Sequence, residues 1–235
     1  MRAIILAGGK GTRLKPYTTL IPKPLVPVGN EWPILEVIIR QLAAGGFRHI
    51  TITVNHLADL IRAYFGDGSR WGVKIDYSCE QSPLSTIGPL TLIKDLPENF
   101  LVMNGDILCN LNYGEFLKYH VRRRNKFTVS AFNRKVKIDF GIIKHNAEHT
   151  IVGFSEKPEY NYDVSMGIYG VNRSVIKALP KGKPYGFDTL MLDGIKRGVK
   201  YEARLFKGFW LDIGRPEDYD YCNDNFKSIK KKLGL

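Results

Sequence analysis

The residues best suited to chemistry lie near the start of the chain, in the segment Leu-Ala-Gly-Gly-Lys-Gly-Thr-Arg-Leu at 6–14. This segment matches neither the G-x-G-x-x-G dinucleotide motif nor the G-x-x-x-x-G-K-[ST] phosphate loop. Its three glycines nevertheless allow close approach of the backbone, whose N–H groups can bind phosphate oxygens. Lys10, Arg13 and Lys15 add positive charge beside them. The segment therefore predicts a phosphate-binding loop.

Two further segments present charged side chains that favour a role at a phosphate site. Lys23 stands between Pro22 and Pro24, and these prolines restrict the backbone that presents it. Asp106 follows an apolar run and the pair Asn104-Gly105, so it stands at the carboxyl end of an expected strand. Open α/β sheets bind their ligands at this edge. We therefore expect Lys23 and Asp106 beside the phosphate loop.

The elements that must position these residues alternate over the first 125 residues. Short apolar runs predict strands, and apolar side chains at helical spacing predict helices. Such alternation favours an α/β fold with a doubly wound, mostly parallel, Rossmann-like sheet. The expected strands are 2–6, 49–54, 73–77 and 100–103, and the expected helices are 33–45, 57–65 and 89–94.

The second half of the chain predicts consecutive strands joined by short turns, which indicates an inserted antiparallel lobe on the substrate side. No repeat or linker divides the chain. We expect a single domain over 1–235, with a nucleotide-binding half at about 1–125 and a substrate-binding half at about 126–235. The expected strands are 127–134, 138–144, 150–155 and 163–171, followed by helices at 173–179 and 186–197, extended segments at 201–205 and 209–211, and a closing helix near 215–230.

Composition excludes several classes of protein. The 235 residues carry 35 Lys+Arg against 23 Asp+Glu, a net charge of +12, and 44% are hydrophobic, which excludes global disorder. No run of about 18 apolar residues is present, so no membrane span is expected. The three cysteines lack C-x-x-C spacing and favour neither a disulfide framework nor a zinc site. The charge suits an anionic ligand, but no nucleic-acid-binding signature accompanies it. We expect a cytoplasmic protein.

Six segments in order give the sequence a specific resemblance to the sugar-1-phosphate nucleotidylyltransferases. It is most similar to those that transfer guanylyl groups to mannose 1-phosphate or heptose 1-phosphate. The likeness extends over nearly the whole chain. The six segments are L-A-G-G-K-G-T-R-L at 6–14, P-K-P-L at 22–25, N-G-D at 104–106, E-K-P at 156–158, M-G-I-Y at 166–169 and G-F-W-L-D-I-G at 208–214.

The resemblance implies a reaction in which a nucleoside triphosphate and a sugar 1-phosphate give a nucleotide sugar and pyrophosphate. The sugar phosphate oxygen attacks the α-phosphorus in line, so the protein must position the substrates and neutralise charge. In the family two carboxylates hold Mg²⁺, and they match Asp106 and Asp212 here. Magnesium prefers oxygen ligands and bridges phosphates, which is consistent with that role.

The resemblance also implies roles for other residues. Arg13 would stabilise the departing pyrophosphate and Lys23 would hold the triphosphate, so these two and Asp106 form the expected catalytic group. Lys157 would neutralise the sugar phosphate, and Glu156 would accept hydrogen bonds from sugar hydroxyls. The expected nucleotide-binding residues are Leu6, Ala7, Gly8, Gly9, Gly11, Thr12, Arg13, Lys23, Glu80, Gly88 and Asn104, and the expected sugar-phosphate-binding residues are Gly141, Glu156, Lys157, Gly167 and Tyr169.

Glu80 bears on the choice of base. Relatives that use dTTP or UTP tend to have glutamine at this place, whereas a carboxylate only accepts hydrogen bonds. Guanine offers two adjacent donors, N1–H and the N2 amino group, so Glu80 favours GTP. Adenine and cytosine also offer an amino donor, so they are not excluded. The alternative enzyme is a cytidylyl- or thymidylyltransferase of the same fold that acts on another phosphorylated acceptor.

Two departures from the family pattern leave the base and the acceptor open: the first alters the base pocket, and the second alters the sugar site. The usual P-L-G-T-A-G loop has Ser85 and Ile87 in place of the glycine and alanine, and the usual N-A-G has Ser165 in place of asparagine. Mannose, a heptose or another phosphorylated acceptor therefore fits the pattern. The chain ends soon after the closing helix, so we expect no C-terminal left-handed β-helix, and we expect a homodimer as one arrangement. A non-catalytic nucleotide-binding regulatory module is the competing class.

Overall fold

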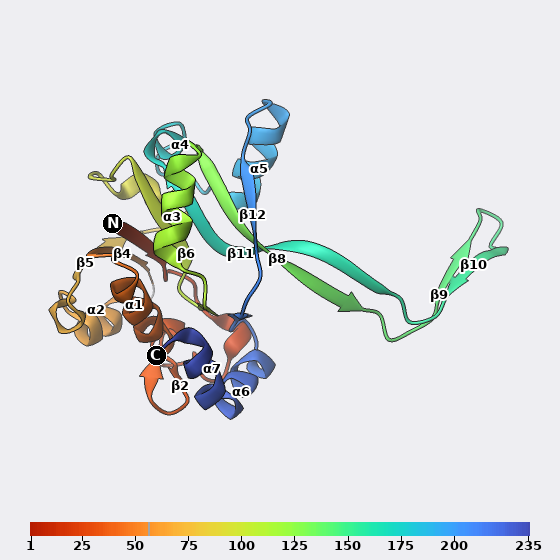
Figure 1. The fold of residues 1–235 in the computed structure, drawn as a ribbon, viewed down its shortest axis with the longest axis horizontal. Helices are drawn as coiled ribbons and strands as arrows, with labels where there is room; N and C mark the ends of the chain where they lie inside the picture. The colour runs from red at the N-terminus through yellow and green to blue at the C-terminus, as the bar shows by residue number, and fades with distance from the viewer. Residues whose placement is uncertain (56) are drawn as a thin grey trace.

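The computed structural model describes residues 1–55 and 57–235, which are built around one central sheet (Figure 1). The strand order is β12-β8-β11-β6-β1-β4-β5. Strand β11 is antiparallel to its neighbours β6 and β8, whereas the other adjacent strands are parallel. The expected mostly parallel α/β sheet is therefore confirmed. The strands of this sheet are β1 (Arg2–Leu6), β4 (His49–Val54), β5 (Lys74–Cys79), β6 (Asn99–Asn104), β8 (Phe127–Lys137), β11 (Glu159–Asn172) and β12 (Glu202–Phe206).

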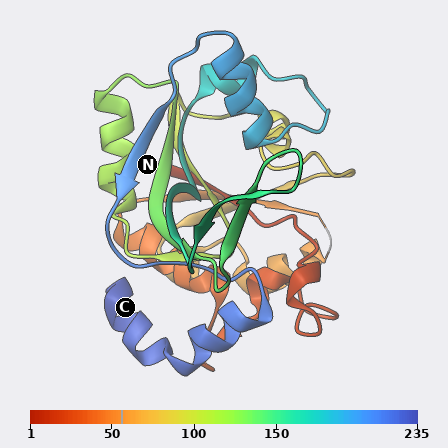
Figure 2. The same ribbon diagram turned by 90° about the vertical axis from the view of Figure 1, so that its right-hand side faces the viewer.

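Helices cover both faces of the sheet (Figure 2), and among the described residues no helix is both long and apolar enough to cross a membrane. The α-helices are α1 (Ile34–Ala44), α2 (Ala58–Phe65), α3 (Tyr113–Arg122), α4 (Arg173–Lys177), α5 (Phe187–Lys196), α6 (Pro216–Asp224) and α7 (Phe226–Leu233). Short 3₁₀ helices are η1 (Thr12–Leu14), η2 (Lys23–Leu25), η3 (Ser69–Trp71) and η4 (Gly88–Leu92). The remaining strands form three small pairs: β2 (Pro27–Val28) with β3 (Trp32–Pro33), β7 (Ile107–Cys109) with β13 (Trp210–Asp212), and β9 (Ile142–His145) with β10 (Ile151–Ser155).

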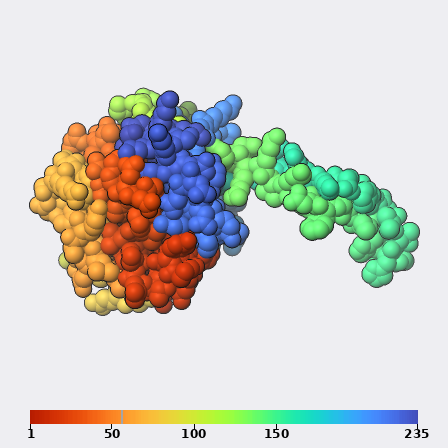
Figure 3. All heavy atoms as spheres, turned by 90° about the horizontal axis from the view of Figure 1, so that it is seen from below, coloured from red at the N-terminus to blue at the C-terminus, as the bar shows by residue number. Residues whose placement is uncertain are grey.

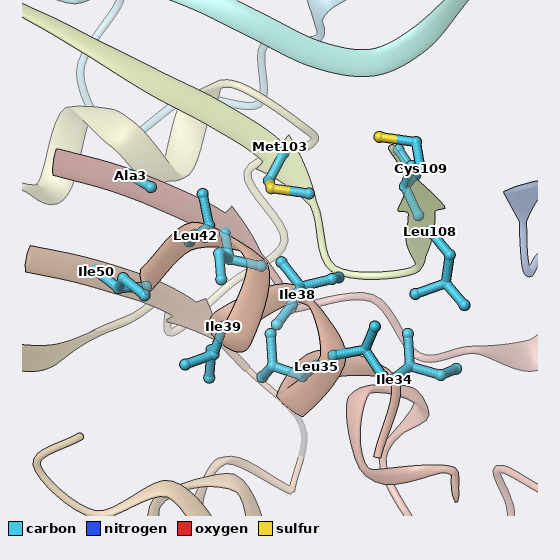
Figure 4. Packing of buried hydrophobic residues seen from close by; sticks show 14 of the residues in the cluster. Ala3, Ile34, Leu35, Ile38, Ile39, Leu42, Ile50, Met103, Leu108 and Cys109 are labelled. Carbon is cyan, nitrogen blue, oxygen red and sulfur yellow. The ribbon is translucent and has the colours of Figure 1, made fainter. Parts of the chain in front are cut away.

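The alternation of side chains along each strand builds a core on each face of the sheet. Ala3 and Ile5 of β1 belong to the larger cluster, whereas Ile4 belongs to the smaller one. In the larger cluster the apolar face of α1 packs against β1, β4 and β6, as Figure 4 shows for Ile38 and Leu42. The two clusters hold the strands rigidly, so the loops at their carboxyl ends leave from fixed positions.

The order of the strands determines which loops meet. From β1 the chain proceeds to β4 and β5 on one side and then returns to β6 on the other side. Ligands of open α/β sheets bind where the strand order reverses in this way. Leu6 pairs in register with Thr53 of β4 and with Asn104 of β6. The loops that follow these three residues therefore open at one crevice.

The inserted lobe projects from the body as a long arm (Figures 1 and 3). Strands β8 and β11 leave the central sheet together and pair in seven successive steps, from Ser165↔Ala131 to Glu159↔Lys137. The hairpin of β9 and β10 forms the end of the projection. We call residues 133–164 the arm, and residues 138–158 its tip.

Several expected elements differ in their bounds from those of the structure. The single closing helix expected near 215–230 is two helices, because the chain turns at Asn225 between α6 and α7. The strand expected at 127–134 continues to Lys137, and the strand expected to begin at 138 begins at Ile142. The extra residues of β8 are mostly charged and exposed, so they lack the apolar alternation that marks a half-buried strand.

Acid should destabilise the fold through His120 of α3. The ring is fully buried, its Nδ1 bonds Thr128 Oγ1 at 2.8 Å, and its Nε2 has no partner among the described residues. Burial lowers the pKa of His120 to about 4 from its usual 6.5. Between pH 4 and pH 6.5, His120 is protonated in the unfolded chain but neutral in the folded one. The stability that is present above pH 6.5 is therefore lost as the pH falls toward 4. We expect the free energy of unfolding to decrease by about 2 kcal/mol between pH 7 and pH 5.

Urea denaturation at both pH values measures this change, and His120→Gln is the control because glutamine does not titrate. The loss between pH 7 and pH 5 should be absent from the variant. An equal loss in the variant and the parent would assign the acid sensitivity to other groups.

Candidate active site

The glycine-rich segment forms an open loop between β1 and η1. Ala7 N–H donates to Thr53 O at 3.0 Å, and Leu14 N–H donates to Gly11 O at 2.9 Å. Within the described part of the chain, the N–H groups of the residues between them, 8–13, donate to no backbone or side-chain acceptor. Gly11 has φ +62°, a left-handed conformation that glycine adopts without a Cβ clash. The loop thus presents a row of free donors, which is an arrangement that binds anions.

Lys23 and Asp106 meet beside this loop. Pro22 and Pro24 flank Lys23 in the turn of η2, and Lys23 Nζ bonds Asp106 Oδ2 at 2.6 Å. The Lys23 side chain is only 11% exposed, so its ammonium is held close to one carboxylate oxygen. The other oxygen, Asp106 Oδ1, is buried without a hydrogen-bond partner among the described residues.

Strand β13 brings Asp212 to Asp106 from a distant part of the sequence. Asp212 pairs with Ile107 in the β7–β13 ladder, and Ile213 N–H donates to Asp106 O at 3.0 Å. Desolvation by the surrounding protein raises the pKa of Asp212, and the charge of Asp106 raises it further, whereas Lys23 and Arg13 lower it. Two neighbouring carboxylates repel each other when both are ionised. A cation bound between them would relieve this repulsion.

The donor set fits a magnesium ion. Asp106 Oδ1 is a buried oxygen ligand without a partner in the part of the chain that the structure describes, and Asp212 supplies a second carboxylate. No group of three or more His, Cys, Asp or Glu side chains suited to a metal occurs in 1–55 or 57–235. Magnesium is commonly held by one or two carboxylates together with substrate phosphates, which matches this pair.

Three cavities share Arg13 and surround the pair of carboxylates. Their volumes are about 250, 340 and 500 Å³, and we call them the central, outer and base cavities. The central cavity is lined by Leu6, Ala7, Gly9, Gly11, Thr12, Arg13, Lys23, Pro24, Gly105, Asp106 and Gly214. The outer cavity is lined by Arg13, Phe132, Arg134, Trp210, Leu211, Asp212, Gly214, Arg215 and Asp218. The base cavity is lined by Leu6, Gly8, Gly9, Lys10, Arg13, Thr53, Asn55, Glu80, Pro83, Ser85, Thr86, Pro89, Asn104 and Asp106.

Glu80 is buried in the wall of the base cavity. Its Oε2 accepts a hydrogen bond from Leu84 N–H at 3.0 Å, which fixes the loop that follows. Its Oε1 lies so near the backbone that a Cβ on Gly8 would come within 2.5 Å of it. Ser85, which replaces the usual glycine of the family loop, has φ +64°. The loop keeps the left-handed conformation of a glycine while adding a hydroxymethyl group to the cavity wall.

Most of the expected nucleotide-binding residues therefore line the central and base cavities. Gly88 instead packs behind the base cavity, where a Cβ would come within 3.0 Å of Leu84 Cβ and of Lys183 O. Gly167 adjoins the site, since a Cβ there would lie 2.6 Å from Asn104 Nδ2. Those that line the central or base cavity are Leu6, Ala7, Gly8, Gly9, Gly11, Thr12, Arg13, Lys23, Glu80 and Asn104.

Tyr169 lines none of the three cavities. Its ring is buried in the smaller core cluster, where it stacks on Phe187 with the ring centroids 3.9 Å apart. The register of β11 is irregular between Ser165 and Tyr169. A contact between Tyr169 and a sugar phosphate therefore stays a prediction.

Three of the expected sugar-phosphate residues lie on the arm rather than in the cavities: Gly141, Glu156 and Lys157. Gly141 packs against Phe154 and Glu156, because a Cβ there would come within 2.6 Å of Phe154 Cζ and 3.1 Å of Glu156 Oε2. Lys157 follows with φ +41°, a strained conformation for a side-chain-bearing residue. Among the described residues that line the three cavities, none comes from the tip of the arm.

Two arginines and a tryptophan of the outer cavity were not among the residues expected from the sequence. Arg215 follows the G-F-W-L-D-I-G segment directly, Trp210 lies within it, and Arg134 lies two residues beyond Phe132 on β8. The position of Arg215 beside Asp212 is a signal that could have been used. Arg134 could not be found in this way, because only the pairing of β8 with β11 brings it to the site.

Comparison with known proteins agrees with this geometry. The chain is 32% identical over 228 residues to the "Mannose-1-phosphate guanyltransferase" of Emericella nidulans, and 31% identical over 227 residues to the "Mannose-1-phosphate guanylyltransferase catalytic subunit beta" of Danio rerio. Each match covers 93% of this chain and 62% of the relative, so the chain spans about three fifths of the length of these proteins.

A solved structure also matches over nearly its full length. HddC from Yersinia pseudotuberculosis, crystallised with GMP-PN, superposes with a TM-score of 0.72 at 26% identity, covering 96% of this chain and 99% of that one. The family described as "Nucleotidyl transferase" matches residues 2–228. On this evidence the chain belongs to the nucleotidyl transferase family.

Proposed function

We propose that the chain transfers a guanylyl group from GTP to a sugar 1-phosphate, with mannose or a heptose as the sugar, and releases pyrophosphate. The observation that carries the proposal is the buried Asp106 Oδ1 beside Asp212, next to a loop of backbone donors, with neither the oxygen nor the donors paired within residues 1–55 and 57–235. Relatives named as mannose-1-phosphate guanylyltransferases, and a neighbour solved with GMP-PN, support the choice of nucleotide and sugar.

Each cavity has a part in this reaction. The free N–H groups of 8–13 bind the phosphates of GTP in the central cavity, and Arg13 stabilises the negative charge of the departing pyrophosphate. The base enters the base cavity, where Glu80 accepts hydrogen bonds from guanine. The sugar phosphate enters the outer cavity, between Arg134 and Arg215. This arrangement holds the attacking oxygen on the opposite side of the α-phosphorus from the pyrophosphate.

Asp106 and Asp212 are the residues that would hold Mg²⁺, as argued above from their oxygens. When bound, the ion supplies positive charge to the phosphate oxygens. Lys23 keeps its ammonium on Asp106 Oδ2 and also lines the central cavity, so it neutralises charge on the carboxylate and on the triphosphate.

Pyrophosphate release tests the proposal directly. The assay supplies Mg²⁺, each of GTP, CTP, dTTP, UTP and ATP, and a panel of hexose and heptose 1-phosphates. We expect release with GTP and mannose or heptose 1-phosphate. Release with another nucleotide alone would replace the guanylyl assignment with the cytidylyl or thymidylyl alternative. Binding of nucleotide without release from any pair would favour the regulatory module.

Glu80→Gln should weaken the preference for GTP. The glutamine carbonyl can keep the bond to Leu84 N–H, which turns its amino group toward the base and replaces an acceptor with a donor. We expect kcat/KM for GTP to fall about 10- to 100-fold while that for dTTP or UTP falls less. Relative kcat/KM values that stay the same across the nucleotides would remove Glu80 from base selection. Gln81→Glu, at the exposed neighbouring position, serves as the control.

A further inference from the structure

The arm is a ribbon whose two faces are both exposed, and one of them carries most of its apolar side chains. Cross-strand partners share a face, so Val136 with Tyr160 and Arg134 with Tyr162 lie on one side, which we call the tyrosine side, and Lys135 with Asn161 lie on the other. Val136, Tyr160 and Tyr162 are exposed, and further exposed apolar residues occur at the tip. The exposed apolar side chains of the arm are Val136, Phe140, Ile143, Ile151, Val152, Phe154, Tyr160 and Tyr162.

A ribbon with exposed apolar side chains is stabilised when another protein surface packs against it. A two-stranded hairpin alone in water has marginal stability, and its edges offer unpaired backbone groups. Covering all of these exposed apolar side chains, those of the tip included, would bury roughly 600–800 Å² per copy, judged from the size of aromatic and aliphatic side chains, and the ~800 Å² per partner of a standard interface is the upper end of this range. The arm alone therefore has the area for a stable association.

The charge of the arm favours a second copy of the chain as the partner that packs against its apolar side chains. The arm carries five basic and five acidic side chains, so the whole net charge of +12 resides on the body. Two bodies repel each other, whereas two neutral arms can meet without that cost. The basic residues of the arm are Arg134, Lys135, Lys137, Lys144 and Lys157, and the acidic ones are Asp139, Glu148, Glu156, Glu159 and Asp163.

The same face leads to the outer cavity. Phe132 and Arg134, which line this cavity at the root of the arm, lie on the tyrosine side of the ribbon. In a twofold pair of antiparallel arms, the tip of each arm lies beside the root of the other. The tip projects from the body (Figures 1 and 3), and it contains Glu156 and Lys157, neither of which lines the outer cavity of its own chain.

We propose that two copies of this chain associate through the tyrosine side of their arms, and that each arm delivers Glu156 and Lys157 to the outer cavity of the other copy. Association through the arms rests on the geometry of the ribbon. The delivery of the two residues also rests on the proposed function, because it assigns them the sugar phosphate of the partner's site.

The association is tested first by mass. Light scattering and sedimentation at micromolar concentration should give twice the 26.7 kDa of the chain. The double variant Tyr160→Ser with Tyr162→Ser should weaken the dimer by at least about 100-fold, since aromatic residues dominate interfaces. The matched control is Asn161→Ser, which changes the opposite side of the same strand and should leave the dimer intact. A monomeric parent chain, or equal effects of both variants, would overturn the association.

Delivery in trans is tested by mixing two defective variants. Asp106→Asn has a defective body and an intact arm, and Lys157→Met has the reverse. Each alone should lose most pyrophosphate release. After subunit exchange, half of the dimers are mixed and each has one complete site, so about a quarter of the parent activity should return.

The outcomes separate the two parts of the proposal. Inactive variants that form mixed dimers without recovering activity would overturn delivery in trans, as would full activity of Lys157→Met alone. A parent chain that is a dimer but inactive with every substrate pair would contradict the proposed function while supporting the association. The mass measurement does not depend on turnover, so failure of one part remains distinct from failure of the other.

Discussion

Replacing Asp106 by asparagine should lower kcat for pyrophosphate release by about 10³-fold or more while leaving the fold intact. Asparagine has nearly the same shape, so the packing of β6 and β7 is kept. The substitution removes the charge from Oδ1, which is buried without a partner, and turns an amide toward the ammonium of Lys23 at the position of a 2.6 Å ion pair. The cation-binding pair then consists of Asp212 alone.

Steady-state kinetics with varied Mg²⁺ measures this effect, and circular dichroism verifies the fold. Asp59→Asn is the matched control, because the Asp59 side chain is 98% exposed on α2 and lies outside the three cavities. The double variant Asp106→Asn with Asp212→Asn should lose far less than the product of the single losses, since both carboxylates serve one group. A kcat within about tenfold of the parent would contradict the assignment of Asp106.

Lys23→Met should lower kcat/KM by about 10²- to 10³-fold. Methionine keeps the length of the side chain but removes the ammonium that neutralises Asp106 in the wall of the central cavity. Lys23→Arg should restore little activity, because the planar guanidinium does not fit a site built for a compact charge on one oxygen. Kinetics at varied GTP separate the loss in kcat from the rise in KM.

Lys15 provides the control for general charge. It follows the same glycine-rich loop but lines none of the three cavities described. Lys15→Met removes the same charge and should change kcat/KM by less than about threefold. Similar losses from both lysine variants would mean that the overall positive field, rather than the contact of Lys23 with Asp106, supports activity.

The part of the site built from strand ends could be predicted from the sequence. The run before Ala7 and the run before Asn104 are apolar enough to indicate buried strands, and the carboxyl ends of neighbouring parallel strands meet. Asp212 required the resemblance, because β13 is three residues long and carries no pattern of its own. Its meeting with Asp106 depends on the β7–β13 ladder, which only tertiary structure reveals.

The arm could be predicted as a lobe but not as a projection. The consecutive strands of the second half are visible in the sequence, and their antiparallel pairing is confirmed. Their direction is set by the continuation of β8 and β11 beyond the sheet, over residues such as Lys135 and Lys137 that are exposed. The pattern of apolar and polar residues along an exposed ribbon does not determine the direction in which it projects. The separation of Glu156 and Lys157 from the cavities could therefore not be predicted from the sequence.

The position of Trp210 should make its fluorescence sensitive to binding in the outer cavity. Its indole lines the outer cavity, donates to Met166 O at 3.3 Å and packs 5.4 Å from the ring of Phe132. Trp32 and Trp71, the other two tryptophans of the chain, line none of the three cavities. In a chain with Trp32→Phe and Trp71→Phe, the fluorescence of one indole should therefore shift to the blue as a sugar phosphate or a neighbouring arm displaces water. Titrations of this emission would follow occupancy of the outer cavity without any turnover.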